Sequence, residues 1–302
     1  MNYFDLHCDS ATALFAKGET LKTSTCHVSE ATISSYDDFG QIFAVFSRPE
    51  LTDDECFTRF FEVADHFEGS NGIKFTKSPE RGFCAILSVE DARLLCGDLT
   101  RLHALCERGV LVLTLLWKGF TCIGGSYDTD EGLTPFGKEV VRECFRLGII
   151  PDVSHASVRS CADALDIAEE YSLPLIASHS DSYEINPHPR NLNTDNAKRI
   201  ASLGGIIGIC LHAPHVGEPA TTDMVCDHIA HYADTLGIDH VALGCDLDGT
   251  NLLPEGIKDQ SGVAKIASVM SHRGFTEKEI SKVFYDNAYA FFTKNPLIQK
   301  GK

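Results

Sequence analysis

Basic residues are scarce in this sequence. Its 302 residues include 26 lysines and arginines against 43 aspartates and glutamates, which gives a formal net charge of -17. Such a balance repels phosphate backbones and anionic membrane surfaces, so we expect no binding to nucleic acid or to a membrane. The sequence also lacks an uninterrupted run of about 18 apolar residues, the length that a membrane-spanning helix needs.

Leader and cysteine motifs are missing as well. The first ten residues, MNYFDLHCDS, lack the basic start and apolar core of a signal peptide, so a cytoplasmic location is expected. None of the 12 cysteines forms a C-x-x-C pair, which argues against a zinc knuckle or a thioredoxin-type site. In the cytoplasm they should be reduced thiols, and in apolar runs they act as small buried hydrophobes.

Short apolar runs, interrupted by helix-period segments, recur along the chain. Hydrophobic residues make up 43% and charged residues 23%, as in a globular protein. Eight runs predict buried strands, over residues 3–9, 41–47, 84–89, 110–116, 148–154, 174–180, 205–211 and 240–246. Helices are predicted between most of them and at the end, over 53–68, 134–148, 157–171, 194–205, 221–237 and 276–292.

This alternation of strands and helices predicts the architecture. It is typical of an α/β fold, a (β/α)8 TIM barrel, with a doubly wound open sheet as the alternative. No linker, internal repeat or low-complexity stretch is visible, so residues 1–302 are expected to form a single catalytic barrel domain. Residues 10–40 are less regular and indicate a small excursion before the second strand.

Histidines and carboxylates stand at the ends of the predicted strands. His7 and Asp9 are two residues apart, so their side chains point the same way. The other strand-end residues are Glu90, Asp152, His155, His179, Asp246 and Asp248. Each alone could be a capping residue, a core histidine or a turn former. In a barrel, however, all of them meet at the rim where active sites are built, and together they predict a metal site.

The number of candidate ligands indicates two metals. One catalytic zinc takes three protein ligands and a water. The candidates are His7, Asp9, Glu90, His155 and His179. Five ligands suit two ions that share one carboxylate, and Glu90 is the natural bridge. Such ions, about 3.5–4 Å apart, would share a hydroxide and clamp a polarised substrate oxygen.

Longer motifs reveal a family resemblance over nearly the whole chain. They are DLHCD, LSVE, LTLLW, LTPFGKEVV, DVSH, ASHSDSYEINPHPRNL and LGCDLDG, in that order. With these motifs the sequence resembles the membrane dipeptidase (renal dipeptidase) family of binuclear zinc peptidases, peptidase family M19. The resemblance implies a barrel of the metal-dependent hydrolase type with two zinc ions per chain. It also implies hydrolysis of dipeptides by a zinc-bridged hydroxide.

The resemblance also implies residue roles. It implies that His7, Asp9 and Glu90 hold one zinc. It also implies that Glu90, His155 and His179 hold the second, with Glu90 as the bridge. Arg190, in HPRN, is similar to the arginine that holds the substrate carboxylate, a task that suits a guanidinium fork. Asp246 resembles the acid/base that handles the proton of the attacking water and the leaving amine. Bacterial members are usually homodimeric, so a homodimer acting on a small dipeptide is expected.

One position departs from the family pattern. Trp117 stands where the animal enzymes have a histidine that contacts the substrate near the developing oxyanion. An indole N–H donates one hydrogen bond but carries no proton charge. Removal of an oxyanion donor typically costs about 10²- to 10³-fold in rate. Trp117 is therefore a candidate substrate contact, and His212, in CLHAPH, is a candidate replacement for the histidine or else a surface-loop residue.

Three functions remain open at this point. The first is a zinc-dependent dipeptidase, a metallopeptidase. The second is a related metal-dependent amidohydrolase acting on another small amide or a lactone, although Arg190 favours a substrate with a carboxylate. The third is a barrel with reduced turnover because of Trp117. The spaced pair His228 and His231, on the predicted helix 221–237, is interpreted as helix surface.

Overall fold

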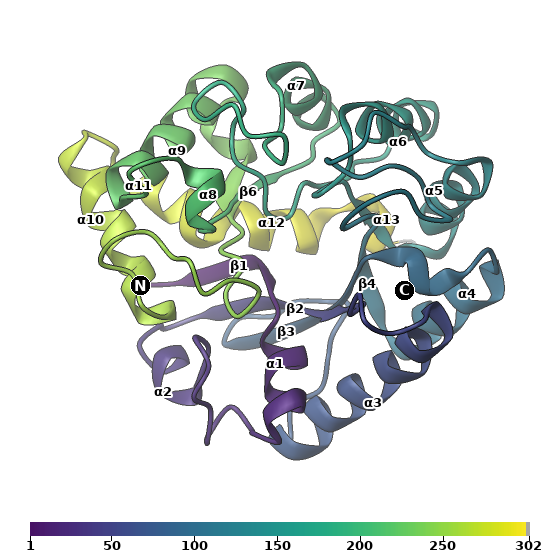
Figure 1. Cartoon of the computed structure of the whole chain (residues 1–302). Coiled ribbons are helices and arrows are strands. Elements are labelled where there is room, and N and C mark those ends of the chain that lie inside the picture. The colour runs from purple at the N-terminus through teal and green to yellow at the C-terminus, as the bar shows by residue number, and fades with distance from the viewer. Residues whose placement is uncertain (300–302) are drawn as a thin grey trace.

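A curled parallel sheet occupies the middle of the computed structural model, with helices arranged around it (Figure 1). The structure describes residues 1–299. Within that range the strands are β1 (Tyr3–Cys8), β2 (Phe39–Phe46), β3 (Phe83–Glu90), β4 (Val110–Thr114), β5 (Ile150–Asp152), β6 (Ile207–Ile209) and β7 (Val241–Leu243). Hydrogen-bonded neighbours follow the order β5-β4-β3-β2-β1-β7-β6, and every pair is parallel.

The segment predicted as the sixth strand, 174–180, closes the sheet into a barrel. Ile176 forms a parallel bridge with Asp152 of β5, and Ala177 forms one with Ile207 of β6. The segment pairs through these single bridges because Ser178 donates its backbone N–H to the Asp152 carboxylate, 2.8 Å away, instead of to a neighbouring strand. The two edges of the sheet are thus joined, which confirms the barrel and rules out the open sheet.

Helices follow the strands largely as predicted. They are α1 (Ser10–Lys17), α2 (Glu30–Ile33), α3 (Asp53–Asn71), α4 (Leu99–Arg108), α5 (Pro135–Leu147), α6 (Val158–Tyr171), α7 (Thr194–Ser202), α8 (Ala213–Val216), α9 (Thr222–Leu236), α10 (Ala264–His272), α11 (Glu277–Ser281), α12 (Asn287–Lys294) and α13 (Pro296–Gln299). The ends of α5 show why the predicted bounds of this helix agree with the structure. Thr134 caps the helix by accepting the Gly137 N–H, and Gly148 ends it with a φ of 75°.

The last predicted helix, 276–292, is continuous but not regular. A π-helical turn, η4 (Lys282–Asp286), separates α11 from α12. Short 3-10 turns complete the structure as η1 (Ala92–Leu95), η2 (Ile238–His240) and η3 (Gln260–Val263). The stretch η4–α12 covers β1, because Phe4 stacks on Phe292 with 5.7 Å between ring centroids and also contacts Tyr285. The buried core therefore extends from the barrel to the C-terminal helices.

The predicted excursion at 10–40 contains only the short helices α1 and α2. Asp248 anchors it to the far end of the chain, because its carboxylate accepts hydrogen bonds from Ser10 Oγ and from the His27 N–H, both at 2.6 Å. All 12 cysteines are free thiols, most of them buried, as expected. No helix within residues 1–299 has both the length and the apolar character needed to cross a bilayer.

Candidate metal centre and active site

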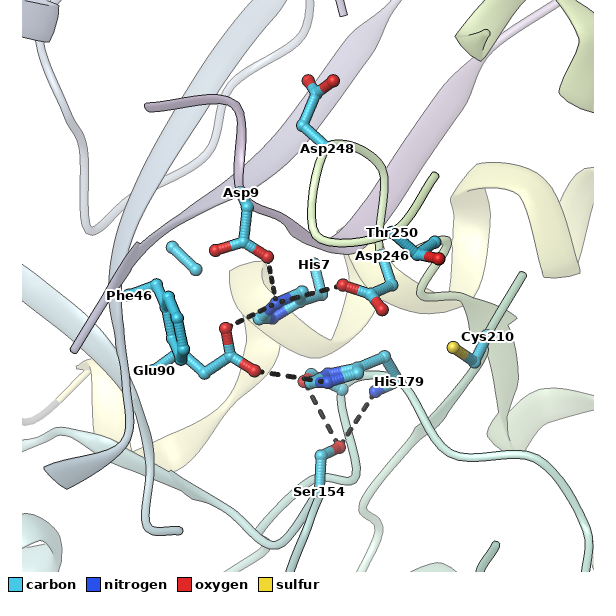
Figure 2. A network of polar contacts seen from close by, with 12 residues as sticks. His7, Asp9, Phe46, Glu90, Ser154, His179, Cys210, Asp246, Asp248 and Thr250 are labelled. Atoms are coloured by element: carbon cyan, nitrogen blue, oxygen red, sulfur yellow. Dashed lines mark hydrogen bonds and ion pairs between the residues drawn. The ribbon is translucent and has the colours of Figure 1, made fainter. Parts of the chain in front are cut away.

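All five predicted metal ligands are brought to one end of the barrel. His7 lies in β1, and Asp9 follows that strand directly; Glu90 is the last residue of β3. His155 follows β5, and His179 lies near the end of the segment that closes the barrel. Figure 2 shows His7, Asp9, Glu90 and His179 pointing toward one another from the ends of β1, β3 and the segment that closes the barrel. The carboxyl ends of parallel strands share one rim, which is why the sequence pattern predicted this meeting.

The first group of ligand atoms surrounds His7. Its Nε2 lies 3.5 Å from Asp9 Oδ2, 3.5 Å from Glu90 Oε2 and 3.9 Å from Asp246 Oδ1. These separations are too long for hydrogen bonds, and this buried nitrogen has no hydrogen-bond partner. Two ligands at about 2.0–2.2 Å from a tetrahedral zinc would stand roughly 3.3–3.6 Å apart. The unpartnered nitrogen and the oxygens facing it therefore fit a divalent cation.

The second group is built from two histidines and the other oxygen of Glu90. His155 Nε2 lies 3.1 Å from Glu90 Oε1 and 2.9 Å from His179 Nε2. The separation between His179 Nε2 and Glu90 Oε1 is 3.7 Å. Glu90 thus turns Oε2 toward His7 and Oε1 toward the histidine pair. This is the orientation that a carboxylate shared by two ions needs.

Electrostatics differ between the two groups. Burial alone would lower the pKa of His7, but the Glu90 and Asp9 carboxylates outweigh it and raise that pKa well above its usual value. For His155 and His179, burial lowers the pKa far below its usual value, and nearby positive charge acts in the same direction. Neutral imidazole is the form that binds metals, and burial favours this form at both residues.

Asp246 lies beside the first group. Burial raises the pKa of its carboxyl well above the usual range; His7 opposes this shift, and Asp9 and Glu90 add to it. The loop that follows passes very close, since a Cβ on Gly249 would lie 2.2 Å from Asp246 Oδ1 and 2.4 Å from Asp9 Oδ2. A side chain at position 249 would push both carboxylates out of place, so this position needs glycine.

The neighbouring carboxylate of Asp248 takes no part in the group around His7. Figure 2 shows its side chain pointing away from that group, toward the excursion that it anchors. The strand-end motif G-x-D-x-D-G therefore divides its two aspartates between different tasks. Asp246 faces the metal centre, and Asp248 accepts hydrogen bonds from Ser10 and His27.

Arg190 lies next to the histidine pair, on the long loop before α7. Its side chain is buried, and it donates hydrogen bonds from Nη2 to the His179 carbonyl at 2.9 Å and from Nη1 to Ser180 Oγ at 3.1 Å. The Nε–H is buried and has no partner. Because a buried guanidinium seeks an anion, this free donor edge fits the predicted contact with a substrate carboxylate.

A cavity of about 280 Å³ opens onto the metal centre. Trp117 forms part of its wall, with its ring edge-on to Phe46 at a centroid distance of 4.9 Å. The other lining residues are Asp9, Thr12, Ala13, Ala16, Arg48, Glu90, His155, Asp246, Asp248 and Gly249. Trp117 thus lies on the cavity wall, and its contact with a substrate stays a prediction.

His212 lies elsewhere on the rim. It is half-buried at the start of α8, and its Nδ1 is 2.6 Å from Thr250 Oγ1. Its ring contacts that of His215, with 4.3 Å between centroids, and His215 in turn contacts His188. His212 is not among the residues that line the cavity. The role of His212 as a replacement hydrogen-bond donor stays a prediction. If it has such a role, it would act from the side of the site where Arg190 lies and not from the side of Trp117.

The interpretation of His228 as helix surface is wrong. This residue of α9 is fully buried, and its Nδ1 accepts the Ser182 backbone N–H at 3.0 Å. Its Nε2 lies 2.8 Å from the Val216 carbonyl, to which it donates. The helix packs this face against the loops beneath Arg190, a tertiary contact that spacing alone does not reveal. His231, one turn later, is partly exposed, as expected.

The chain thus combines a parallel barrel, a cluster of candidate metal ligands at its rim and a cavity beside them. The comparisons with known proteins give the family: the model for membrane dipeptidase (peptidase family M19) matches residues 1–295. The chain belongs to this family, which confirms the resemblance found in the sequence.

Two curated relatives support this membership. Dipeptidase tcpJ of Claviceps purpurea (strain 20.1) is 36% identical over 157 residues, which cover 51% of this chain and 36% of the relative. An uncharacterized dipeptidase of Schizosaccharomyces pombe is 33% identical over 174 residues, or 56% of this chain and 41% of that protein. The aligned parts therefore span less than half the length of either relative.

Solved structures share the fold over almost the entire chain. The metallopeptidase described as dipeptidase AC has a TM-score of 0.86 at 23% identity, covering 98% of this chain and 99% of its own. A metallopeptidase from Rhodobacter sphaeroides, bound to a phosphinate mimic of the dipeptide L-Ala-D-Ala, has a TM-score of 0.84 at 23% identity and the same coverage.

Proposed function

We propose that this protein is a dipeptidase that works with two zinc ions per chain. The observation that carries the proposal is the orientation of Glu90, whose two carboxylate oxygens face two separate sets of ligand atoms. Family membership and the dipeptide mimic bound by the Rhodobacter sphaeroides relative support the choice of substrate. His7, Asp9 and Glu90 would hold one ion, and Glu90, His155 and His179 would hold the other.

The chemistry of such a centre is hydrolytic. Divalent ions at these ligands polarise a carbonyl and lower the pKa of water toward neutrality. Asp246, whose Oδ1 lies 3.9 Å from His7 Nε2, would accept the proton of the attacking water and pass it to the departing amine. Because the same carboxyl takes up and releases the proton, peptide-bond cleavage needs no further acid.

Substrate binding is assigned to Arg190. Its Nη groups already bond to the His179 carbonyl and to Ser180, which fixes the plane of the guanidinium. The remaining N–H donors can hold the C-terminal carboxylate of a dipeptide. Trp117, on the cavity wall, contacts the other end of the substrate.

A substrate panel tests this function. Zinc-loaded protein should hydrolyse L,L- or L,D-dipeptides and should be much slower on the same dipeptides with an amidated C-terminus. Lactones and N-acyl amines without a carboxylate serve as the comparison. Hydrolysis of those neutral compounds together with inactivity on every dipeptide would favour the amidohydrolase alternative. Metal-loaded protein without any turnover would favour the barrel with reduced activity.

The homodimer and the cytoplasmic location expected from the sequence also belong to this proposal. Both stay predictions. Sedimentation velocity of the purified protein measures its oligomeric state, with a dimer expected. Fractionation of the source cells measures its location, with the protein expected in the soluble fraction.

A further inference from the structure

Asp152 is a fully buried carboxylate that the proposed mechanism does not use. It ends β5 and accepts four hydrogen bonds. Its Oδ1 accepts the backbone N–H groups of Ser154 at 2.9 Å and Ser178 at 2.8 Å. Its Oδ2 accepts hydrogen bonds from the hydroxyls of Thr114 and Ser178, each with an O···O distance of 2.6 Å. All four donors point at Asp152, so it serves only as an acceptor.

The Ser178 hydroxyl connects this carboxylate to a predicted metal ligand. Its oxygen also lies 2.7 Å from His179 Nδ1. A serine hydroxyl has a single proton, and Asp152 receives it. Ser178 Oγ must therefore accept the bond from His179, which places the imidazole proton on Nδ1. The lone pair of His179 is then on Nε2, the atom that faces Glu90 and His155.

We propose that Asp152, acting through Ser178, is a positioning residue that fixes His179 as its Nδ1–H tautomer and so keeps Nε2 free to bind a metal. The inference rests on the proposed metal centre, whose ligand it orients. A second bond steadies the same residue, since the His179 backbone N–H donates to Ser154 Oγ at 3.0 Å, as Figure 2 shows. In contrast, the buried Nδ1 of His155 has no hydrogen-bond partner.

Asp152→Asn tests which ring nitrogen of His179 carries the proton, and it removes no side-chain volume from the core. The asparagine keeps an oxygen for the two backbone N–H groups, and its amide nitrogen replaces Oδ2. That nitrogen donates to Ser178 Oγ, so the serine proton turns to His179 Nδ1 and the imidazole proton moves to Nε2. Ser178→Ala is the second variant, in which the acceptor for Nδ1–H is lost altogether.

Thr114→Ala is the matched control. Thr114 and Ser178 each donate to Asp152 Oδ2 at 2.6 Å, but only Ser178 contacts His179. Long-range ¹H–¹⁵N spectra of the metal-stripped, ¹⁵N-histidine-labelled full chain report which ring nitrogen carries the proton. The His179 signal is identified by its loss in His179→Asn. Competition with a chromogenic chelator gives the zinc affinity of each variant.

The wild type and Thr114→Ala should show a proton on Nδ1 of His179, and their zinc affinities should agree. In Asp152→Asn the proton should move to Nε2, and zinc affinity should fall about 10- to 100-fold, the usual effect of losing a partner that orients a ligand. Ser178→Ala should lose the fixed Nδ1–H signal and show a similar fall in affinity. If both variants keep the Nδ1–H tautomer and wild-type affinity, the inference is overturned.

These readouts do not depend on hydrolysis. A shifted tautomer in a protein that cleaves no dipeptide would leave the positioning role intact and remove the proposed function. An unshifted tautomer in an active dipeptidase would do the reverse. Circular dichroism on each variant confirms that the barrel is folded, and if Asp152→Asn does not fold, Ser178→Ala decides the matter.

Discussion

The two halves of the metal centre differ in what surrounds their histidines. On the β1 side, His7 lies among carboxylates, which raise its pKa. On the other side, burial lowers the pKa of His155 and His179. In the first half carboxylates surround the histidine, whereas in the second half His179 bonds to Ser178 and the Nδ1 of His155 has no partner. Glu90 belongs to both halves, so their difference has to be tested through residues on each side.

The largest effect on turnover is expected from Asp246→Asn, in the carboxylate-rich half. This change removes the proton acceptor but no assigned ligand, so both ions should stay while kcat falls about 10²- to 10⁴-fold. Steady-state kinetics and metal analysis on the same preparation measure both quantities. Asp248→Asn is the control and should lose less activity, because Asp248 faces the excursion. Loss of metal instead of turnover in Asp246→Asn would make Asp246 a ligand.

Arg190→Ala tests the histidine-rich half, where the guanidinium donates a hydrogen bond to the His179 carbonyl. A lost contact with a buried carboxylate costs about 2–5 kcal/mol, so kcat/KM should drop roughly 30- to 5,000-fold. An amidated dipeptide should show a comparable drop on the wild-type enzyme and little further loss on the variant. Metal analysis serves as the control for an indirect effect through His179. Equal rates on free and amidated dipeptides would remove the role given to Arg190.

Removing one histidine should separate the two halves. His155 contacts only the second set of ligand atoms, so His155→Asn should lower the metal content from about two ions to about one per chain. His212→Asn is the matched control, because His212 lies on the rim and bonds to Thr250 outside both sets. It should retain both ions. A variant at 155 that loses both ions, or neither, would show that the halves are not separate.

A buried histidine outside the centre is expected to give the smallest effect. His228 has both ring nitrogens bonded to backbone groups, unlike the unpartnered Nε2 of His7. His228→Asn should leave metal content unchanged and lower the free energy of unfolding in urea by about 1–3 kcal/mol, since buried groups lose their partners. His231→Asn, on the partly exposed face of the same helix, should change it little. Lost metal in His228→Asn would contradict this distinction.

Much of the barrel and its ligand cluster could be predicted from the sequence because both depend on local pattern. Apolar runs mark the strands, and the parallel arrangement forces strand-end residues such as His7, Glu90 and His155 onto one rim. Capping residues marked helix ends in the same local way, as Thr134 shows. Whole-chain motifs then supplied roles for Arg190 and Asp246 that no spacing rule contains.

Other features depend on contacts that the pattern does not encode. The Asp152 carboxylate accepts the Ser178 backbone N–H, which therefore does not bond to a neighbouring strand. The predicted sixth strand pairs with its neighbours only through single bridges. Ser154 and Ser178, which bond to His179, are small polar residues, and in the sequence they look like serines of an ordinary loop. The buried face of α9, with His228, was hidden because helical spacing does not say which face a distant loop covers.

The central claim is that Glu90 bridges two ions, and metal analysis of the wild type beside Glu90→Gln tests it most directly. Glutamine keeps the size of the side chain but leaves only one oxygen to coordinate. After loading with zinc and removal of excess metal, elemental analysis should find about two ions per chain in the wild type and reduced occupancy of both positions in the variant. A wild type that binds no more than one ion, or a variant that keeps one position fully occupied, would contradict the bridge.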